Sequence, residues 1–143
     1  MNSVATDIKD KLVTAGIGEF AAATGWSIHI SSEPPTPDTT ITLYDTGGPP
    51  PEGVQDRSKK PLRFGSILIR VRGDGYGSAH TKIKEVYDAI VGFGKFTVSA
   101  VDSGDLDVHY KGVFPTSEIL FLEQDGDDRY IWVVNFQARR EEK

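Results

Sequence analysis

The sequence predicts an α+β fold, in which a mixed or antiparallel sheet of about 5–7 strands carries two main helices packed on one face. Two segments have apolar residues at helical spacing, and about seven others have the alternating or β-branched pattern of strands. The final third of the chain consists of strand-like segments alone. With 143 residues, the chain is expected to form a single domain over residues 1–143.

The two predicted helices cover residues 3–15 and 77–91. Ser3 fits the N-cap position of the first helix, and Gly16 marks its exit. The apolar residues of this helix fall on one stripe: Val4, Ile8, Leu12 and Ala15. The second helix has a similar stripe: Ala79, Ile83, Val86, Tyr87 and Ile90. Such stripes indicate helices that pack against another layer of the protein.

The predicted strands are best described together, because they share alternating or β-branched patterns. They cover residues 26–31, 39–44, 62–72, 96–101, 108–114, 118–123 and 129–138. The apolar centre of 62–72 indicates an interior position in the sheet. The last strand is apolar on both faces at its start, so we expect it to be covered on both sides. Asp125-Gly126 predicts a hairpin turn before it.

Composition excludes several classes of function. The chain has no cysteine, which removes disulfide scaffolds, thiol nucleophiles and cysteine-ligated zinc. Its net charge of −5 argues against general nucleic-acid binding, because that affinity rests on cationic contacts to phosphate. No segment approaches the ~20 apolar residues that span a bilayer, so we expect no membrane partner.

Residues 45–61 form a Pro/Gly-rich loop that is unusually long for a compact domain and is expected to be functional or disordered. The loop opens with Asp45-Thr46-Gly47, the tripeptide of aspartic proteases, in which two aspartates share a proton. A homodimeric aspartic protease is therefore one alternative. The Gly48-Pro49-Pro50-Pro51 sequence that follows does not fit the tight turn of such a site. A turn capped by Asp45 is the simpler interpretation.

A glycine-rich connection leads into the second helix at Gly73-Asp74-Gly75-Tyr76-Gly77-Ser78. Phosphates bind at such strand-to-helix junctions, so a small-ligand or nucleotide-binding domain is a second alternative. However, Ser78 stands where the third glycine of a dinucleotide motif belongs, and no lysine follows as in a P-loop. We favour a plain connection in which Ser78 is the N-cap.

The remaining polar residues predict no catalytic, cofactor or metal site. The Asp-rich stretches at 102–107 and 125–128 lack the spacing of an EF-hand and are expected to be charged turns. His29, His80 and His109 are far apart and show no spacing typical of metal ligands. A non-enzymatic assembly subunit is the class of protein that remains.

Several short motifs follow one another between Trp26 and Gly94. In order, they are Trp26 in an apolar strand, the Pro-Pro-Thr-Pro-Asp loop at 34–38, ITLYDTGG at 41–48, ILIRVRG at 67–73 with Tyr76 after it, and EVYD at 85–88. Their order and spacing resemble the minor capsid or tail-terminator family of long-tailed bacteriophages. The resemblance is strongest at YDTGG and IRVRG, and no motif matches in the C-terminal third.

The resemblance implies a subunit that assembles as a ring, commonly a hexamer. Such a ring caps the finished tail tube, stops its polymerisation and forms the surface that joins the head. The implied partners are other copies of the chain, the tail-tube protein and a head-completion or connector protein, while DNA passes through the ring without specific binding. The implied location is the head-proximal end of the virion tail, after assembly in the cytoplasm of the bacterial host.

The resemblance also makes the Pro/Gly-rich loop a candidate contact surface for neighbouring subunits or the tail tube. Prolines suit this role because they lower the entropy that a loop loses when it binds. The residues expected there are Asp45, Gly47, Gly48, Pro50 and Arg57. Arg70 and Arg72 are expected to be paired charges near subunit boundaries, with simple surface solubility as the alternative.

Overall fold

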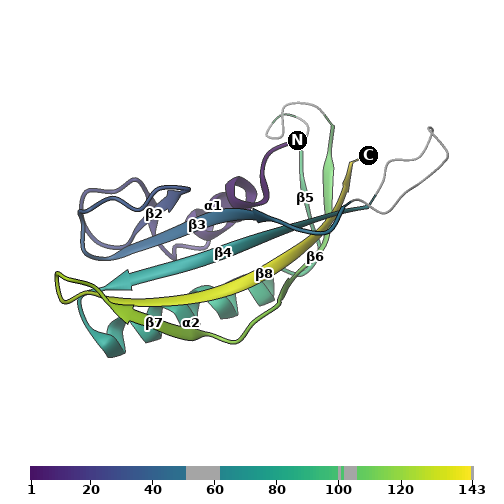
Figure 1. The fold of residues 1–143 in the computed structure, drawn as a ribbon. Coiled ribbons are helices and arrows are strands. Elements are labelled where there is room, and N and C mark those ends of the chain that lie inside the picture. The colour runs from purple at the N-terminus through teal and green to yellow at the C-terminus, as the bar shows by residue number, and fades with distance from the viewer. Residues whose placement is uncertain (51–61, 100, 102–105, 143) are drawn as a thin grey trace.

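The protein is built on a curled eight-stranded sheet with two helices on one face (Figure 1). The computed structural model describes residues 1–50, 62–99, 101 and 106–142. The helices are α1 (Val4–Thr14) and α2 (Tyr76–Phe93). The strands are β1 (Glu19–Phe20), β2 (Ser27–Ile30), β3 (Thr40–Gly47), β4 (Arg63–Gly73), β5 (Phe96–Val98), β6 (Val108–Pro115), β7 (Leu120–Gln124) and β8 (Tyr130–Glu142).

The longest strand pair, β4 with β8, forms the middle of the sheet. The two strands are antiparallel and in register from Arg63 opposite Arg140 to Gly73 opposite Tyr130. The strand order is β1-β2-β3-β4-β8-β6-β5, and β7 also pairs with β8. Consequently the far edge of β8 is shared by two strands, β6 along its C-terminal half and β7 along its N-terminal end. Parallel pairing occurs between β1 and β2 and between β2 and β3, so the sheet is mixed.

The hydrophobic core lies between the sheet and the two helices. The helix stripes contribute Val4, Ile8, Leu12, Ala79, Ile83, Val86 and Ile90. The central strands contribute Ile41, Leu43, Ile67, Ile69, Val71, Val134 and Phe136. Burial of one such large side chain is worth roughly 1.5–3 kcal/mol, so this layer supplies the main driving force for folding.

The start of β8 is buried on both faces, as the sequence predicts. Trp132 and Val134 belong to the core beneath the helices, whereas Ile131 and Val133 alternate with them and face the other side. Both of these are buried, with 0% of Ile131 and 9% of Val133 exposed. In register, they lie beside Arg72 and Arg70 of β4. A second, smaller layer therefore covers this face of the sheet.

The structure confirms the predicted fold class, both helices and the order of the seven predicted strands. Ser3 caps α1, since its hydroxyl accepts a hydrogen bond from the Thr6 amide. Some boundaries shift, since β5 ends at Val98 and β8 continues to Glu142, and three further details differ. The two-residue strand β1 has too little sequence to show a pattern, and β3 continues through Gly47 instead of ending before Asp45. The N-cap of α2 is Gly75, and the Ser78 hydroxyl donates to the Gly75 carbonyl from inside the helix.

The predicted Asp125-Gly126 hairpin is also present, joining β7 to β8. Its turn is longer than a two-residue Asp-Gly turn, since β7 ends at Gln124 and β8 begins at Tyr130. Asp128, and not Gly126, has a positive φ, of 60°. The Asp125 carboxylate accepts hydrogen bonds from the amides of Asp127 and Arg129, which fixes the longer loop.

Gly73, at the end of β4, allows α2 to pack closely on the sheet. A Cβ at this position would lie 2.8 Å from Cβ of Ala79. We expect Gly73→Ala to lower the free energy of unfolding by about 1–3 kcal/mol, because the added methyl group overpacks this contact. Chemical denaturation monitored by tryptophan fluorescence measures the change.

The matched control is Gly77→Ala in α2. A Cβ there would meet no atom within 4 Å, so only the helix propensity changes. This variant is expected to be more stable by up to about 1 kcal/mol. Equal effects of the two substitutions would contradict the packing argument.

Candidate assembly surfaces

Asp45 has a structural role at the start of α1. Its Oδ1 accepts a hydrogen bond from the Ala5 amide at 3.1 Å, one of the amides that the helix itself leaves unpaired. The carboxylate also complements the positive end of the helix. Directly after Asp45 the strand has a bulge, and Gly47 adopts a φ of 80°. The Asp-Thr-Gly tripeptide is thus explained by a helix-to-strand contact within one chain.

The sequence-predicted contact residues do not form one cluster. Asp45, Gly47, Gly48 and Pro50 are exposed and follow one another at the end of β3, and Arg57 lies outside the described residues. Arg70 and Arg72 lie opposite Thr42 and Thr40, toward the other end of β3. The structure therefore separates the arginine pair from the Asp45–Pro50 stretch.

Arg72 is the centre of a buried polar network on the face of the sheet opposite the helices. Only 2% of the residue is exposed. Its Nη1 donates to Oε1 of Glu33 at 3.0 Å, and Nε of Arg70 donates to Oε2 of the same carboxylate at 2.9 Å. Arg72 also donates to three carbonyl oxygens of the loop: those of Pro34, Pro37 and Asp38.

This network fastens the proline-containing loop that follows β2 onto the sheet. Arg129, at the start of the β8 region, adds a hydrogen bond from Nη1 to the Pro35 carbonyl at 2.7 Å. Each guanidinium nitrogen of Arg72 donates to a carbonyl or a carboxylate oxygen, as a charge removed from water requires. Within the chain, Arg70 and Arg72 share the carboxylate of Glu33, and their role as paired charges near a subunit boundary stays a prediction.

His29 lies beside this network, and the charges of the network change its pKa. Its Nε2 is 2.6 Å from the hydroxyl oxygen of Ser27. Burial lowers the pKa of His29 and the charge of Arg72 lowers it further, while Glu33 opposes them in part. His29 is therefore mainly neutral at pH 7 and adds no further positive charge beside Arg70 and Arg72.

A second buried network joins α1 to the C-terminal strands. The Tyr110 hydroxyl donates to Oδ2 of Asp7 at 2.6 Å, and Nη1 of Arg140 lies 3.8 Å from the same carboxylate oxygen. Arg140 also donates to the Asn2 carbonyl at 2.7 Å. Burial raises the pKa of Tyr110, and the hydrogen bond and charge of Asp7 act in the same direction against the charge of Arg140. The phenol therefore stays neutral and keeps its donor role.

The strand β7 forms an exposed apolar edge. Its residues are all exposed, including 58% of Leu120, 36% of Phe121 and 47% of Leu122. Tyr76, 52% exposed, extends the patch, with its ring centroid 5.3 Å from that of Phe121. Contiguous exposed apolar residues of this kind mark interaction surfaces. The sequence signal was the unbroken apolar run Ile119-Leu120-Phe121-Leu122, which a half-buried strand does not need.

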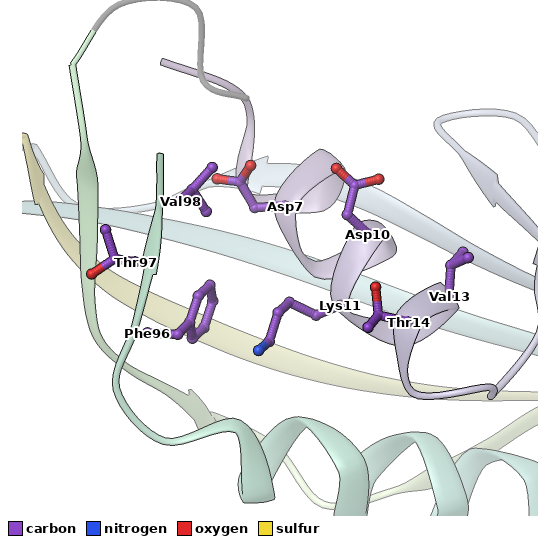
Figure 2. A pocket seen from close by; sticks show the side chains of 8 residues that line it. All are labelled: Asp7, Asp10, Lys11, Val13, Thr14, Phe96, Thr97 and Val98. Atoms are coloured by element: carbon purple, nitrogen blue, oxygen red, sulfur yellow. The ribbon is translucent and has the colours of Figure 1, made fainter. Parts of the chain in front are cut away.

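A groove of about 390 Å³ separates α1 from β5 (Figure 2). It is lined by Asp7, Asp10, Lys11, Val13, Thr14, Phe96, Thr97 and Val98. Figure 2 shows the Lys11 side chain extending toward the ring of Phe96, and Nζ lies 4.8 Å from the ring centroid. The lining mixes apolar and charged groups on a helix and a strand.

The features that suggested other chemistry have structural explanations. Tyr76 at the start of α2 packs against Phe121, Tyr130 and Trp132, so aromatic rings line the glycine-rich junction. Within the described residues, no group of three or more His, Asp or Glu side chains is placed to hold a metal ion. Residues 102–105 of the first Asp-rich stretch lie outside the described part of the chain. None of the described helices is long and apolar enough to cross a membrane.

Comparison with known proteins decides the family. The sequence model described as "Bacteriophage tail terminator protein" matches residues 11–142. The chain belongs to the bacteriophage tail terminator family. The family consists of structural phage tail proteins and is not known as an enzyme family. The resemblance found in the motifs between Trp26 and Gly94 is thereby confirmed, and the match extends it into the C-terminal third.

A solved structure supports the fold of this tail terminator independently. A chain from the structure titled "Virion of native gene transfer agent (GTA) particle" superimposes with a TM-score of 0.56 at 20% sequence identity. The alignment covers 97% of this chain and 95% of that chain. No curated protein sequence matches the chain significantly.

We expect the Glu33→Ala variant of the tail terminator to lose about 2–3 kcal/mol of unfolding free energy. The substitution leaves the Arg72 guanidinium buried without its counter-charge, although the carbonyl hydrogen bonds remain. Urea denaturation at pH 7 measures the loss.

The matched control is Glu85→Ala, which removes the partner of Lys82 on α2. The Glu85 side chain is 48% exposed, so we expect a change below about 0.5 kcal/mol. If Glu33→Ala lowers the free energy of unfolding no more than Glu85→Ala does, the network does not hold the loop after β2 on the sheet.

Proposed function

We propose that this tail terminator forms a ring on the end of the phage tail tube, stops its polymerisation and provides the surface that joins the tail to the head. The observation that carries the proposal is the family match over residues 11–142. The ring is proposed to be a homo-oligomer, commonly a hexamer in this family. Its proposed place is the head-proximal end of the virion tail, after assembly in the cytoplasm of the bacterial host.

The proposed partners are further copies of the chain, the tail-tube protein and a head-completion or connector protein. DNA is proposed to pass through the ring without specific binding, which agrees with the net charge of −5. Exposed apolar residues on β7 and the groove beside β5 support a protein that is completed by assembly.

The residues predicted for these contacts keep that role as proposals. Asp45, Gly47, Gly48 and Pro50 are accessible to a neighbour or to the tube, and Arg57 belongs to the same proposed loop surface. Arg70 is half-buried and Arg72 is 2% exposed, so any effect of Arg72 on a subunit boundary acts through the loop that it holds.

A tube-assembly experiment tests the proposed function. We expect the purified chain, added during polymerisation of its own tail-tube protein, to shorten the tubes in electron micrographs in proportion to its concentration. Light scattering on the tube-bound or free protein is expected to give the mass of a closed oligomer. An unrelated acidic protein of similar size is the control. Unchanged tube lengths, with the protein absent from the tubes, would contradict the proposal.

A further inference from the structure

The two ends of the sheet carry different surfaces. In Figure 1, β7 and its turn into β8 lie at one end of the molecule, and β5 lies at the other. The β7 end carries the exposed carboxylates of Glu123, Asp127 and Asp128, of which Asp127 is paired with Arg129. At the β5 end, Lys95 precedes the strand and is exposed, and Lys11 reaches toward Phe96. An acidic apolar projection lies at one end of the molecule, and the groove that contains Lys11 lies at the other.

The strand β7 is an exposed edge strand that can dock on another chain. Among the described residues it pairs with β8 alone, so its second backbone edge has no strand beside it. Leu120 and Leu122 are 58% and 47% exposed, next to the exposed carboxylate of Glu123. An edge strand that is both apolar and unpaired invites addition of another chain, and soluble proteins normally cover it.

The groove beside β5 can bind a strand from another chain. β5 is the last strand in the sheet order, and its residues Phe96 to Val98 line the groove opposite α1. Val13, Phe96 and Val98 supply apolar surface. Among the described strands β5 pairs with β6 alone, so its other edge offers backbone donors and acceptors.

The charged residues that line the groove are the carboxylates of Asp7 and Asp10 and the ammonium group of Lys11, and both carboxylates already have cationic partners. Nζ of Lys9 lies 2.5 Å from Oδ1 of Asp10, and Asp7 is held by Tyr110 and Arg140. Lys11 contacts the rings of Phe93 and Phe96 and forms no ion pair within the described part of the chain. A carboxylate entering the groove would therefore meet Lys11 as its available partner.

We propose that β7 of one copy docks into the groove between α1 and β5 of the next copy, so that the ring is closed by one repeated head-to-tail contact. Leu120 and Leu122 cover the apolar lining, and Glu123 faces Lys11. This inference rests on the proposed ring and specifies how its subunits join. A closed ring of heterologous contacts requires two different surfaces on each copy, and each surface makes one contact. Pairing of β7 with β7 would instead bring like charges together and leave the groove open.

Cysteine cross-linking tests this contact, because the natural chain has no cysteine. The full-length variants are Leu122→Cys on β7, and Thr14→Cys or Thr97→Cys on the two walls of the groove. All three positions are exposed, and circular dichroism checks that each variant is folded. Under mild oxidation, a mixture of Leu122→Cys with either groove variant is expected to form disulfide-linked heterodimers, since a disulfide needs Cα atoms within about 7 Å.

Each single variant alone is expected to stay uncross-linked. Leu122→Cys mixed with Val91→Cys, whose substituted residue is 49% exposed on α2, is the matched control and is also expected to give no dimer. A chain carrying both Leu122→Cys and Thr97→Cys is expected to give a ladder of covalent oligomers that ends at the ring size.

The outcomes separate this contact from the ring itself. Self-dimers of Leu122→Cys, or a ring by light scattering in which neither groove variant reacts, would overturn the docking and leave the proposed ring intact. A monomer by light scattering, alone and with tube protein, together with no cross-linking, would overturn both. Cross-links between β7 and both walls of the groove would support the docking even where the tube partner is absent.

Discussion

The antiparallel pairing of β4 with β8 sets the constraints that the rest of the structure meets. It runs in unbroken register from Arg63 and Arg140 to Gly73 and Tyr130. The buried apolar residues of β4 face the helices, whereas the start of β8 is apolar on both faces, so both faces of the sheet need a cover. The two helices cover one face and form the core with it. The other face needs a second cover, and the loop that follows β2 provides it through the buried side chain of Arg72. A buried arginine is costly in isolation, which explains why Glu33 and three carbonyl groups surround it.

The same central pair also determines which edges are left for assembly. Because β8 is longer than its neighbours, its far edge is divided between β6 and β7. β7 therefore projects at one end as an apolar edge, while β5 ends the sheet at the other beside α1. In a single chain the exposed Leu120 and Leu122 of β7 would favour aggregation. In a closed oligomer, one edge can cover the other in every copy, which reconciles the exposed surface with a stable subunit.

The elements that could be predicted from sequence are those whose signals are local. The stripe from Val4 to Leu12, the alternation of β4 and the two apolar faces of β8 each reflect one segment and its own burial. What could not be predicted depends on pairing across the chain. Arg72 looks like a surface residue until the loop with Glu33 folds over it, and Asp7 looks like a helix-capping charge until Tyr110 meets it from β6. The sequence of β6 or β7 alone likewise does not show that both strands pair with the same edge of β8.

The family assignment makes this protein a structural component of a phage tail, and its position on the tail is the central claim of the account. Electron microscopy of tails assembled with gold-labelled protein tests that claim most directly. The account predicts label at one end of each tube, the end that meets the head, and at no point along the tube wall. Label distributed along the tube, or at the opposite end, would contradict a terminator and indicate another structural role in the tail.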